Sequence, residues 1–227
     1  QLFYYASPKN ATEQYLYVTN WDTPTVSTLL SPEQQKGTHE YTISPNGALA
    51  FHSFSNINNA PKSEWVSLPK HESMGVAGKV NAIAVNVQAK HAPEFFTVTT
   101  SEGVTMDAWM VKPTNFDPQK KYPVVFYVYT EPWGQTAKNE YGTGYNFLYD
   151  GSMADDGYIY ISMDNRGTPV PKGSAWRKSI YQKIGEVNIR DQALGAKEIF
   201  KLPYVDTSRV AVWGWSGGGS ATLNLMF

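Results

Sequence analysis

Short runs of alternating apolar and polar residues, rich in aromatic side chains, fill about the first seventy positions of the chain. Runs of this kind, separated by turn residues, predict antiparallel strands. The clearest turn is Ser44-Pro45-Asn46-Gly47, because proline fixes φ and glycine accepts a positive φ. The predicted strands are Leu2–Ala6, Tyr15–Thr19, Thr25–Leu30, Glu40–Ile43, Ala48–Phe54 and Glu64–Leu68. Their spacing of about ten residues favours a meander such as a β-propeller blade.

This pattern divides the chain. One blade and a fraction cannot bury a core alone, so we expect further blades upstream and interpret residues 1–72 as the C-terminal part of a β-propeller domain. Residues 73–93 are predicted to be a connector with a weak helical stretch. From residue 94 the period changes. The sequence predicts a hairpin of Glu94–Thr100 with Val104–Val111. It then predicts three strands buried on both faces, which are Tyr122–Thr130, Tyr158–Met163 and Val210–Trp213, and a helix over Ile189–Phe200 that precedes the last strand. Strands that alternate with helices predict a mostly parallel sheet with helices on both faces.

Composition restricts the function. Hydrophobic residues make up 41% of the chain and charged residues 17%, which is typical of a globular protein. The net charge of −1 gives no electrostatic footprint for nucleic acid. The absence of cysteine excludes disulfides, thiolate catalysis and cysteine-based zinc sites. No apolar run approaches the roughly 20 residues that a membrane-spanning helix requires.

The chemistry of the chain is concentrated after the last predicted strand. Val210–Trp213 runs into Gly214-Trp215-Ser216-Gly217-Gly218-Gly219, and residues 220–227 have a helical pattern. Strand, G-x-S-x-G and helix together are the context of a nucleophile elbow, in which flanking glycines avoid collisions around a strained serine. The alternative is a glycine-rich turn that cradles a phosphate, but no P-loop lysine and no G-x-G-x-x-G spacing accompany it. We therefore interpret Ser216 as a nucleophile.

An oxyanion hole takes one N–H from the residue after the nucleophile and a second donor from the loop after the third strand. Gly217 supplies the first N–H. Tyr129 stands at the end of the strand Tyr122–Thr130, where its hydroxyl could be the second donor; a packed aromatic is the alternative.

The chain resembles the prolyl oligopeptidase family of serine peptidases, and within it the dipeptidyl-peptidase IV subfamily. The matching residues are Lys120-Lys121-Tyr122-Pro123, Val128-Tyr129, Asp164-Asn165-Arg166-Gly167, Gly185-Glu186, Asp191-Gln192 and Val212-Trp213-Gly214-Trp215-Ser216. The resemblance implies that residues 94–227 are the N-terminal half of an α/β-hydrolase peptidase domain, truncated after the nucleophile elbow. It implies roles for Ser216 as nucleophile and for Gly217 N–H and Tyr129 hydroxyl as oxyanion donors.

The same resemblance implies release of N-terminal dipeptides, with Xaa-Pro among the substrates, from a peptide partner. It implies no metal or organic cofactor, raises a homodimeric parent as one option, and points to an exported protein. One departure bears on specificity: the subfamily commonly has tyrosine after the nucleophile, where its ring shapes the proline pocket, and this chain has Gly217. A strict preference for proline is therefore not expected.

Several acidic residues near these motifs are weaker candidates. Asp164 and Arg166 are more simply explained by a strand-end turn held by an arginine–carboxylate bond. Glu131 is a rim residue, a substrate contact or ordinary surface, and Asp155-Asp156 is predicted to be a solvated helix end.

The triad is incomplete in this sequence. In the α/β-hydrolase fold the order along the chain is serine, then acid, then histidine, and the eleven residues after Ser216 include neither. The four histidines, His39, His52, His71 and His91, all precede Ser216 and are expected to be packed or exposed. We therefore expect a fragment that is inactive alone. Two alternatives stay open: an acylaminoacyl peptidase or esterase on the same fold, and a non-catalytic binding protein based on the propeller.

Overall fold

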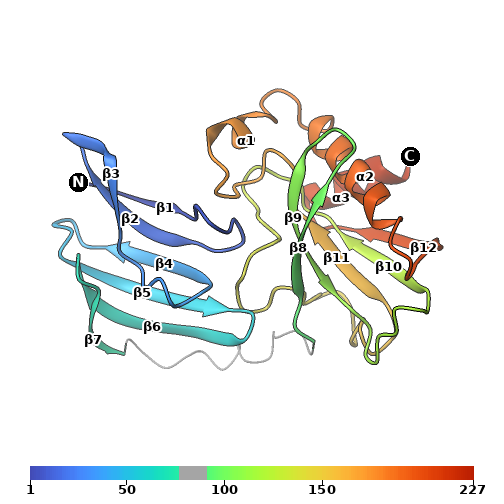
Figure 1. Ribbon diagram of the computed structural model, residues 1–227, viewed down its shortest axis with the longest axis horizontal. Helices are drawn as coiled ribbons and strands as arrows, with labels where there is room; N and C mark the ends of the chain where they lie inside the picture. The colour runs from blue at the N-terminus through green and yellow to red at the C-terminus, as the bar shows by residue number, and fades with distance from the viewer. Residues whose placement is uncertain (77–90) are drawn as a thin grey trace. The chain divides into compact units, whose positions relative to one another are not determined.

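The computed structural model describes residues 1–76 and 91–227, which belong to two units (Figure 1). The first unit comprises Gln1–Gln88 together with Lys138–Gly142, and the second comprises Ala89–Ala137 together with Thr143–Phe227. No helix in the described residues is long and apolar enough to cross a membrane.

The first unit contains two antiparallel sheets. One has the order β1(Leu2–Ala6), β2(Tyr15–Asn20), β3(Thr23–Leu29), and the other the order β4(Thr38–Ile43), β5(Leu49–Asn56), β6(Asn59–Ser67), β7(Glu72–Val76). The turn between β4 and β5 forms as predicted: Gly47 N–H donates to the Ser44 carbonyl at 2.8 Å, with Gly47 at φ +70°. Each sheet is therefore a meander of consecutive hairpins, which agrees with the six strands that the sequence predicted.

Strand β7 was not predicted. The sequence assigned part of it to the connector, whereas Glu72–Val76 pairs with β6 along the edge of the four-stranded sheet. All five residues are exposed, so no alternation of apolar and polar positions marks the strand. The rest of the predicted connector, including its weak helical stretch, falls mainly on residues 77–90, outside the described residues.

A small apolar core holds the first unit together; it comprises Leu16, Leu30, Ala50, Val66 and Leu68. The segment Lys138–Gly142 is bound to the same unit through Asn139. Its N–H donates to the Thr12 carbonyl at 2.6 Å, and its side-chain oxygen accepts from Ile57 N–H at 3.2 Å. These bonds tie the segment to the turn between β1 and β2 and to the turn after β5.

The second unit is built on a five-stranded sheet in the order β12-β10-β11-β9-β8. Its strands are β8(Glu94–Thr99), β9(Thr105–Val111), β10(Tyr122–Tyr127), β11(Ile159–Met163) and β12(Val205–Trp213). β12, β10 and β11 run parallel, while β9 is antiparallel to both β11 and β8. The predicted hairpin is confirmed. The expectation of a mostly parallel sheet is confirmed only in part, because β10, β11 and β12 pair in parallel whereas β9 is antiparallel to both of its neighbours.

Strand β11 is buried along all five residues, as its continuous apolar run predicted. Strand β12 differs from its prediction: it lies at the edge of the sheet, and Val210 is 40% exposed. The difference has a simple cause, because within the described residues β12 pairs only with β10, so one side of the strand is uncovered.

Three helices accompany the sheet: α1(Ser174–Lys178), α2(Val187–Ile199) and α3(Gly217–Met226). Ile199 of α2 and Ala221 of α3 belong to the same apolar core as Met106, Phe126 and Ile161, which share one face of the sheet (Figure 1). On the opposite face, the described covering is non-helical and comes from the connection between β10 and β11, including Ala137 and Ala154. Helices therefore cover one face of the described sheet rather than both. The short helix α1 was not predicted.

Candidate active site

Ser216 lies between β12 and α3 in a backbone conformation that serine rarely adopts, with φ 54° and ψ −119°. Such strain persists only where the surroundings fix it. The glycines on either side explain how the turn closes: a Cβ on Gly214 or on Gly218 would overlap the Val128 carbonyl oxygen of the neighbouring strand. The turn therefore requires glycine at both positions, and it leaves Ser216 exposed at the N-terminus of a helix.

The parallel register of β10 and β12 brings Tyr129 to the same edge of the sheet. Tyr127 pairs with Trp213, and Val128 N–H donates to the Trp213 carbonyl at 3.0 Å. Tyr129 follows on one strand, and the serine turn follows on the other. The two oxyanion donors that the sequence named, Tyr129 and Gly217, thus come from adjacent strand ends.

The orientation of Tyr129 is controlled by two residues that the sequence did not single out. Trp133 donates its indole N–H to the Tyr129 hydroxyl at 3.1 Å, which leaves the hydroxyl proton available for another acceptor. Gly134 packs against the Tyr129 ring so closely that a Cβ there would overlap ring carbons. The Tyr-x-x-x-Trp-Gly spacing was visible in the sequence, but nothing in it indicated this contact.

Gly217, the residue that the sequence analysis named beside Tyr129, begins α3, where the first N–H groups have no partner within the helix. A positive end of the helix dipole at this point favours developing negative charge. Glu131 occupies the space beside this glycine: a Cβ on Gly217 would overlap the Glu131 carboxylate. The sequence left three alternatives for Glu131: a rim residue, a substrate contact or ordinary surface. In the structure its carboxylate occupies the space that a side chain at position 217 would need.

Thr130 is a second strained residue, with φ 69° in a β-branched side chain, and it is 3% exposed. Two buried amides hold it. The Asn165 side chain donates to its carbonyl at 3.3 Å, and the Asn188 side chain donates to its hydroxyl at 3.1 Å. Gln192 in turn donates to the Asn165 side-chain oxygen at 3.0 Å. These amides fix the loop that carries Tyr129 and Glu131.

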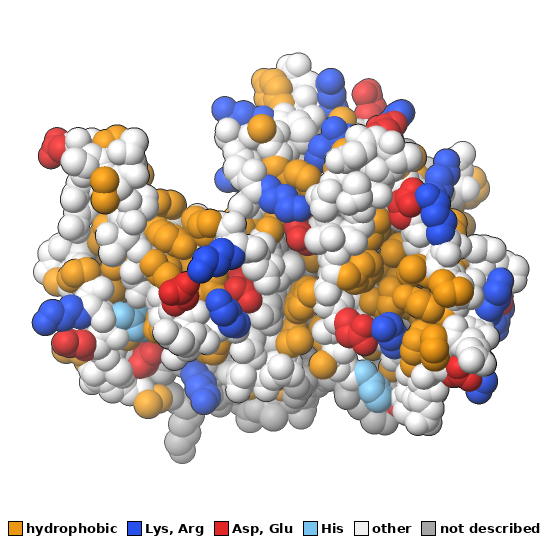
Figure 2. All heavy atoms as spheres, in the orientation of Figure 1, with side chains coloured by type: hydrophobic (Ala, Val, Ile, Leu, Met, Phe, Trp, Pro, Cys, Tyr) orange, Lys and Arg blue, Asp and Glu red, His pale blue; other side chains and the backbone are white. Residues whose placement is uncertain are grey.

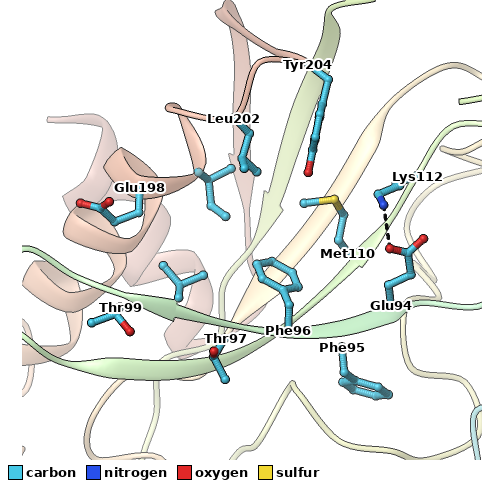
Figure 3. A pocket seen from close by; sticks show the side chains of 12 residues that line it. Glu94, Phe95, Phe96, Thr97, Thr99, Met110, Lys112, Glu198, Leu202 and Tyr204 are labelled. Carbon is cyan, nitrogen blue, oxygen red and sulfur yellow. Dashed lines mark hydrogen bonds and ion pairs between the residues drawn. The ribbon is translucent and has the colours of Figure 1, made fainter. Parts of the chain in front are cut away.

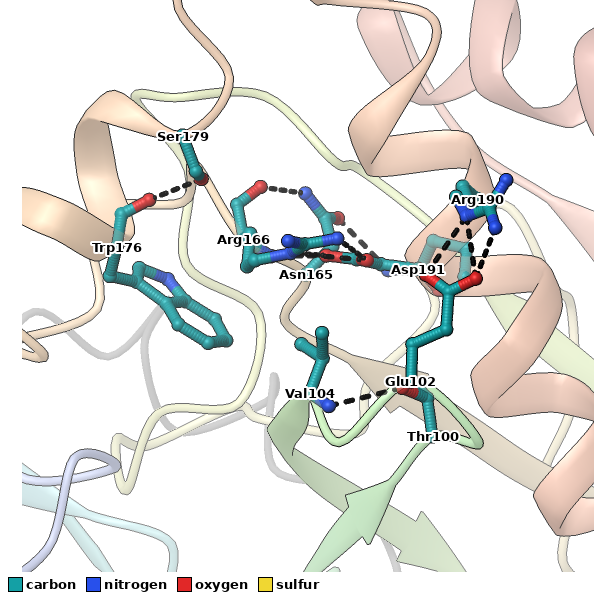
Figure 4. Close-up of polar contacts among 10 residues, drawn as sticks. Thr100, Glu102, Val104, Asn165, Arg166, Trp176, Ser179, Arg190 and Asp191 are labelled. Carbon is teal, nitrogen blue, oxygen red and sulfur yellow. Dashed lines mark hydrogen bonds and ion pairs between the residues drawn. The ribbon is translucent and has the colours of Figure 1, made fainter.

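Asp164 and Arg166 have structural contacts, as the simpler interpretation held, but they do not pair with each other. Asp164 accepts hydrogen bonds from Thr136 N–H at 2.8 Å and Ala137 N–H at 2.9 Å. Arg166 binds Asp191 of α2 through two guanidinium nitrogens, at 3.0 and 2.7 Å (Figure 4). Burial raises the pKa of Asp164 to about 6, outweighing its hydrogen bonds.

Asp155 and Asp156 lie in a turn rather than at a helix end. Asp155 bonds His91 at 3.1 Å, and Asp156 accepts from the Tyr149 hydroxyl at 2.7 Å. His91 is therefore engaged elsewhere, and the other three histidines belong to the first unit. Within the described residues, no histidine hydrogen-bonds Ser216.

A separate pocket of about 360 Å³ opens beside β8 and the end of α2 (Figure 3). Phe96, Met110 and Leu202 line it, and the Lys112–Glu94 ion pair stands at its edge. Figure 2 shows hydrophobic side chains gathered on this part of the second unit, next to acidic and basic ones. The pocket includes none of the three candidate catalytic residues.

Comparison with known proteins finds one matching family and several similar peptidases. Residues 148–227 match the model of the prolyl oligopeptidase family. The "Probable dipeptidyl peptidase 4" of Aspergillus fumigatus is 30% identical over 98% of this chain and 29% of the relative. The "Probable dipeptidyl-aminopeptidase B" of Ajellomyces capsulatus is 40% identical over 56% of this chain and 13% of the relative.

The solved structure of dipeptidyl peptidase 4 from Porphyromonas gingivalis is similar across 98% of this chain and 31% of that protein, with a TM-score of 0.81 at 28% identity. The chain thus spans about 29% of the length of the A. fumigatus relative. The family match covers the serine turn, and the similarity to dipeptidyl peptidases extends through both units. The chain belongs to the prolyl oligopeptidase family of serine peptidases.

Proposed function

We propose that this chain supplies the nucleophile and the oxyanion hole of a serine dipeptidyl peptidase. The observation that carries the proposal is the strained Ser216 turn, closed by glycines against the strand end that presents Tyr129. Strain at a serine exposed on a helix N-terminus has no structural benefit of its own, whereas it serves a nucleophile.

In the proposed reaction, Ser216 Oγ gives its proton to a general base and attacks the carbonyl carbon of a peptide bond. Collapse of the tetrahedral intermediate breaks the C–N bond, the amine leaves with that proton, and water hydrolyses the acyl-enzyme that remains. The carbonyl oxygen becomes negatively charged as the tetrahedral intermediate forms. Gly217 N–H and the Tyr129 hydroxyl donate hydrogen bonds to it, and Trp133 orients the Tyr129 proton. A histidine and an acid from the remainder of a longer protein would complete the triad.

The architecture supports assigning the two units to a propeller and a hydrolase domain. We propose that residues 1–72 are the end of a β-propeller, because β4–β7 form a four-stranded antiparallel meander like one blade. We propose that residues 94–227 are the first half of an α/β-hydrolase domain, because parallel strands β11, β10 and β12 lead to the serine turn.

The proposed substrate class is supported by the relatives, whose names are those of a dipeptidyl peptidase and a dipeptidyl-aminopeptidase. Gly217 and Glu131 modify that expectation. Gly217 has no side chain, and the Glu131 carboxylate lies in the space that a Cβ there would occupy, so a polar group stands beside Ser216 in place of a ring. We therefore propose a dipeptidyl peptidase in which the residue before the cleaved bond is not restricted to proline.

The test is made on the full-length protein as its own cell produces it. Ser216→Ala should abolish both release of dipeptides from Xaa-Pro and Xaa-Ala amides and labelling by a fluorophosphonate. Ser220→Ala is a matched control, because Ser220 is exposed one turn later in α3. Retained activity in Ser216→Ala would refute the proposal. Turnover of simple acyl esters without dipeptide release would replace it with an esterase, and failure of the native protein to label would replace it with a binding protein.

A further inference from the structure

Three potential metal ligands meet in the first unit, and none of them is among the candidate catalytic residues of the second unit. His52 lies on β5, Glu64 lies opposite it on β6, and His71 lies in the turn that leads to β7. One ligand atom from each residue lies within 4.8 Å of the other two. From sequence alone these histidines were expected to be packed or exposed, because their positions are separated by strands and turns.

The hydrogen bonds around His52 leave two acceptors facing each other. His39 Nε2 lies 2.8 Å from the Gln35 carbonyl oxygen, so that nitrogen carries a proton. In a neutral His39 the other nitrogen, Nδ1, is then an acceptor, and it receives the proton of His52 Nε2 at 2.9 Å. A neutral His52 therefore directs the lone pair of Nδ1 at the Glu64 carboxylate, 3.2 Å away. Two electron-rich groups at this distance require a cation between them.

A proton on His52 is one such cation, but the environment opposes it. The His52 side chain is 1% exposed, and it stacks on Tyr41 with ring centroids 4.5 Å apart. A metal ion satisfies the same two groups without charging the imidazole.

We propose that His52, through Nδ1, together with Glu64 and His71 binds a zinc ion in the first unit. Two imidazole nitrogens and one carboxylate oxygen are a ligand set that zinc accepts, with a fourth position for water. The ligands are supported from behind, since His52 Nε2 is held by His39 and His71 Nε2 lies 2.8 Å from the Tyr41 hydroxyl. A cavity of about 440 Å³ lined in part by His52 and Glu64 provides an entry path.

Binding requires a small rearrangement. Ligand atoms around tetrahedral zinc lie about 3.4 Å apart, closer than the 4.8 Å limit of this cluster. His52 is fixed by burial, whereas Glu64 and His71 are only partly buried and can move toward it. The bound ion would join β5, β6 and the start of β7, so its role would be to stabilise the outer part of the four-stranded sheet.

The experiment uses the full chain without a histidine tag, treated with chelator and then titrated with zinc chloride. We expect one equivalent of zinc to bind, and a hundredfold excess over Kd to raise Tm by at least about 5 °C. Cobalt should give the visible absorption of a tetrahedral nitrogen–oxygen site. His71→Ala and Glu64→Gln should each weaken binding by at least about tenfold. His91→Ala is the matched control, because His91 also pairs with a carboxylate, Asp155, but in the second unit.

The outcomes separate clearly. Absence of zinc binding by the unmodified chain overturns the proposal, whatever the variants do. Equal binding by unmodified chain, His71→Ala and Glu64→Gln overturns it as well, as does loss of the bound equivalent in His91→Ala. Circular dichroism of each variant excludes loss of fold as the cause, and neither serine labelling nor peptidase activity enters the measurement.

Discussion

Replacement of Gly218 by alanine tests whether the serine turn depends on close contact with β10. A Cβ at this position would overlap the Val128 carbonyl oxygen and lie 3.2 Å from the Tyr129 Cα. Both neighbours are backbone atoms, so neither can rotate aside. The end of β10 or the start of α3 must move instead. Overpacking of this kind costs about 1–3 kcal/mol, and the better helix propensity of alanine offsets about 1 kcal/mol.

Gly219→Ala provides the comparison, because it adds the same methyl group one residue further into the same helix. There the nearest atom is the Gly214 carbonyl oxygen at 3.5 Å, an ordinary contact. Helix propensity alone then applies, and Gly219→Ala should be more stable than the original chain by up to about 1 kcal/mol. The two variants should therefore differ by about 1–3 kcal/mol in the free energy of unfolding, in favour of Gly219→Ala.

The assay is urea unfolding followed by tryptophan fluorescence, with fluorophosphonate labelling of the full-length protein as a second measurement. Gly218→Ala should also label more slowly, by up to about 100-fold, because the turn and Tyr129 are displaced relative to each other. Equal stabilities of the two alanine variants, or a more stable Gly218→Ala, would refute the reasoning that the turn is closed by contact with Val128.

Three further predictions concern the loop around Tyr129 and its support. Trp133→Phe in the full-length protein should lower kcat by about tenfold with little change in KM, since it removes only the indole N–H that orients the Tyr129 hydroxyl; an unchanged kcat would show that the bond has no role. The folded pKa of Asp164 lies above its usual 3.8, so its protonated form stabilises the fold at low pH; the free energy of unfolding should fall by about 2 kcal/mol between pH 4 and pH 6, and Asp164→Asn should remove that slope in urea titrations. Arg166→Met leaves Asp191 buried without its cation and should cost about 3–5 kcal/mol by urea unfolding, whereas a cost below 1 kcal/mol would mean that Asp191 finds another partner.

Local signals in the sequence were sufficient for most of the strands. Runs such as Ile159–Met163 are buried on both faces and read as apolar throughout, so the pattern of residues reflects the structure directly. The exceptions are edge strands. β7 is exposed at every position, and β12 has an apolar sequence but, among the residues that the structure describes, a neighbouring strand on one side only. An apolar sequence shows that a strand can be buried, but it does not show whether neighbouring strands pair with both of its edges.

The prediction of a mostly parallel sheet was incomplete for a similar reason. The hairpin of β8 and β9 was recognised, but its attachment to the parallel strands was not, because the pairing of Tyr160 with Val111 joins residues 49 positions apart. The prediction of helices on both faces was also wrong for the described residues. The connection that covers the second face contributes Ala137 and Ala154 without any helical period. Side-chain periodicity identifies elements, whereas the order and covering of the sheet depend on contacts between distant residues.

Two residues at the candidate site have a strained backbone, and the structure holds them by opposite means. Ser216 keeps its conformation because Gly214 and Gly218 have no Cβ that would overlap the Val128 carbonyl oxygen. These glycines form a pattern that is visible in the sequence. Thr130 keeps its conformation because the side chains of Asn165 and Asn188, which are 35 and 58 residues away in the sequence, donate hydrogen bonds to it. No local pattern records such contacts. The glycine-closed serine turn was therefore predictable from six consecutive residues, while the support of the loop that carries Tyr129 became visible only when β10, β11 and α2 were brought together.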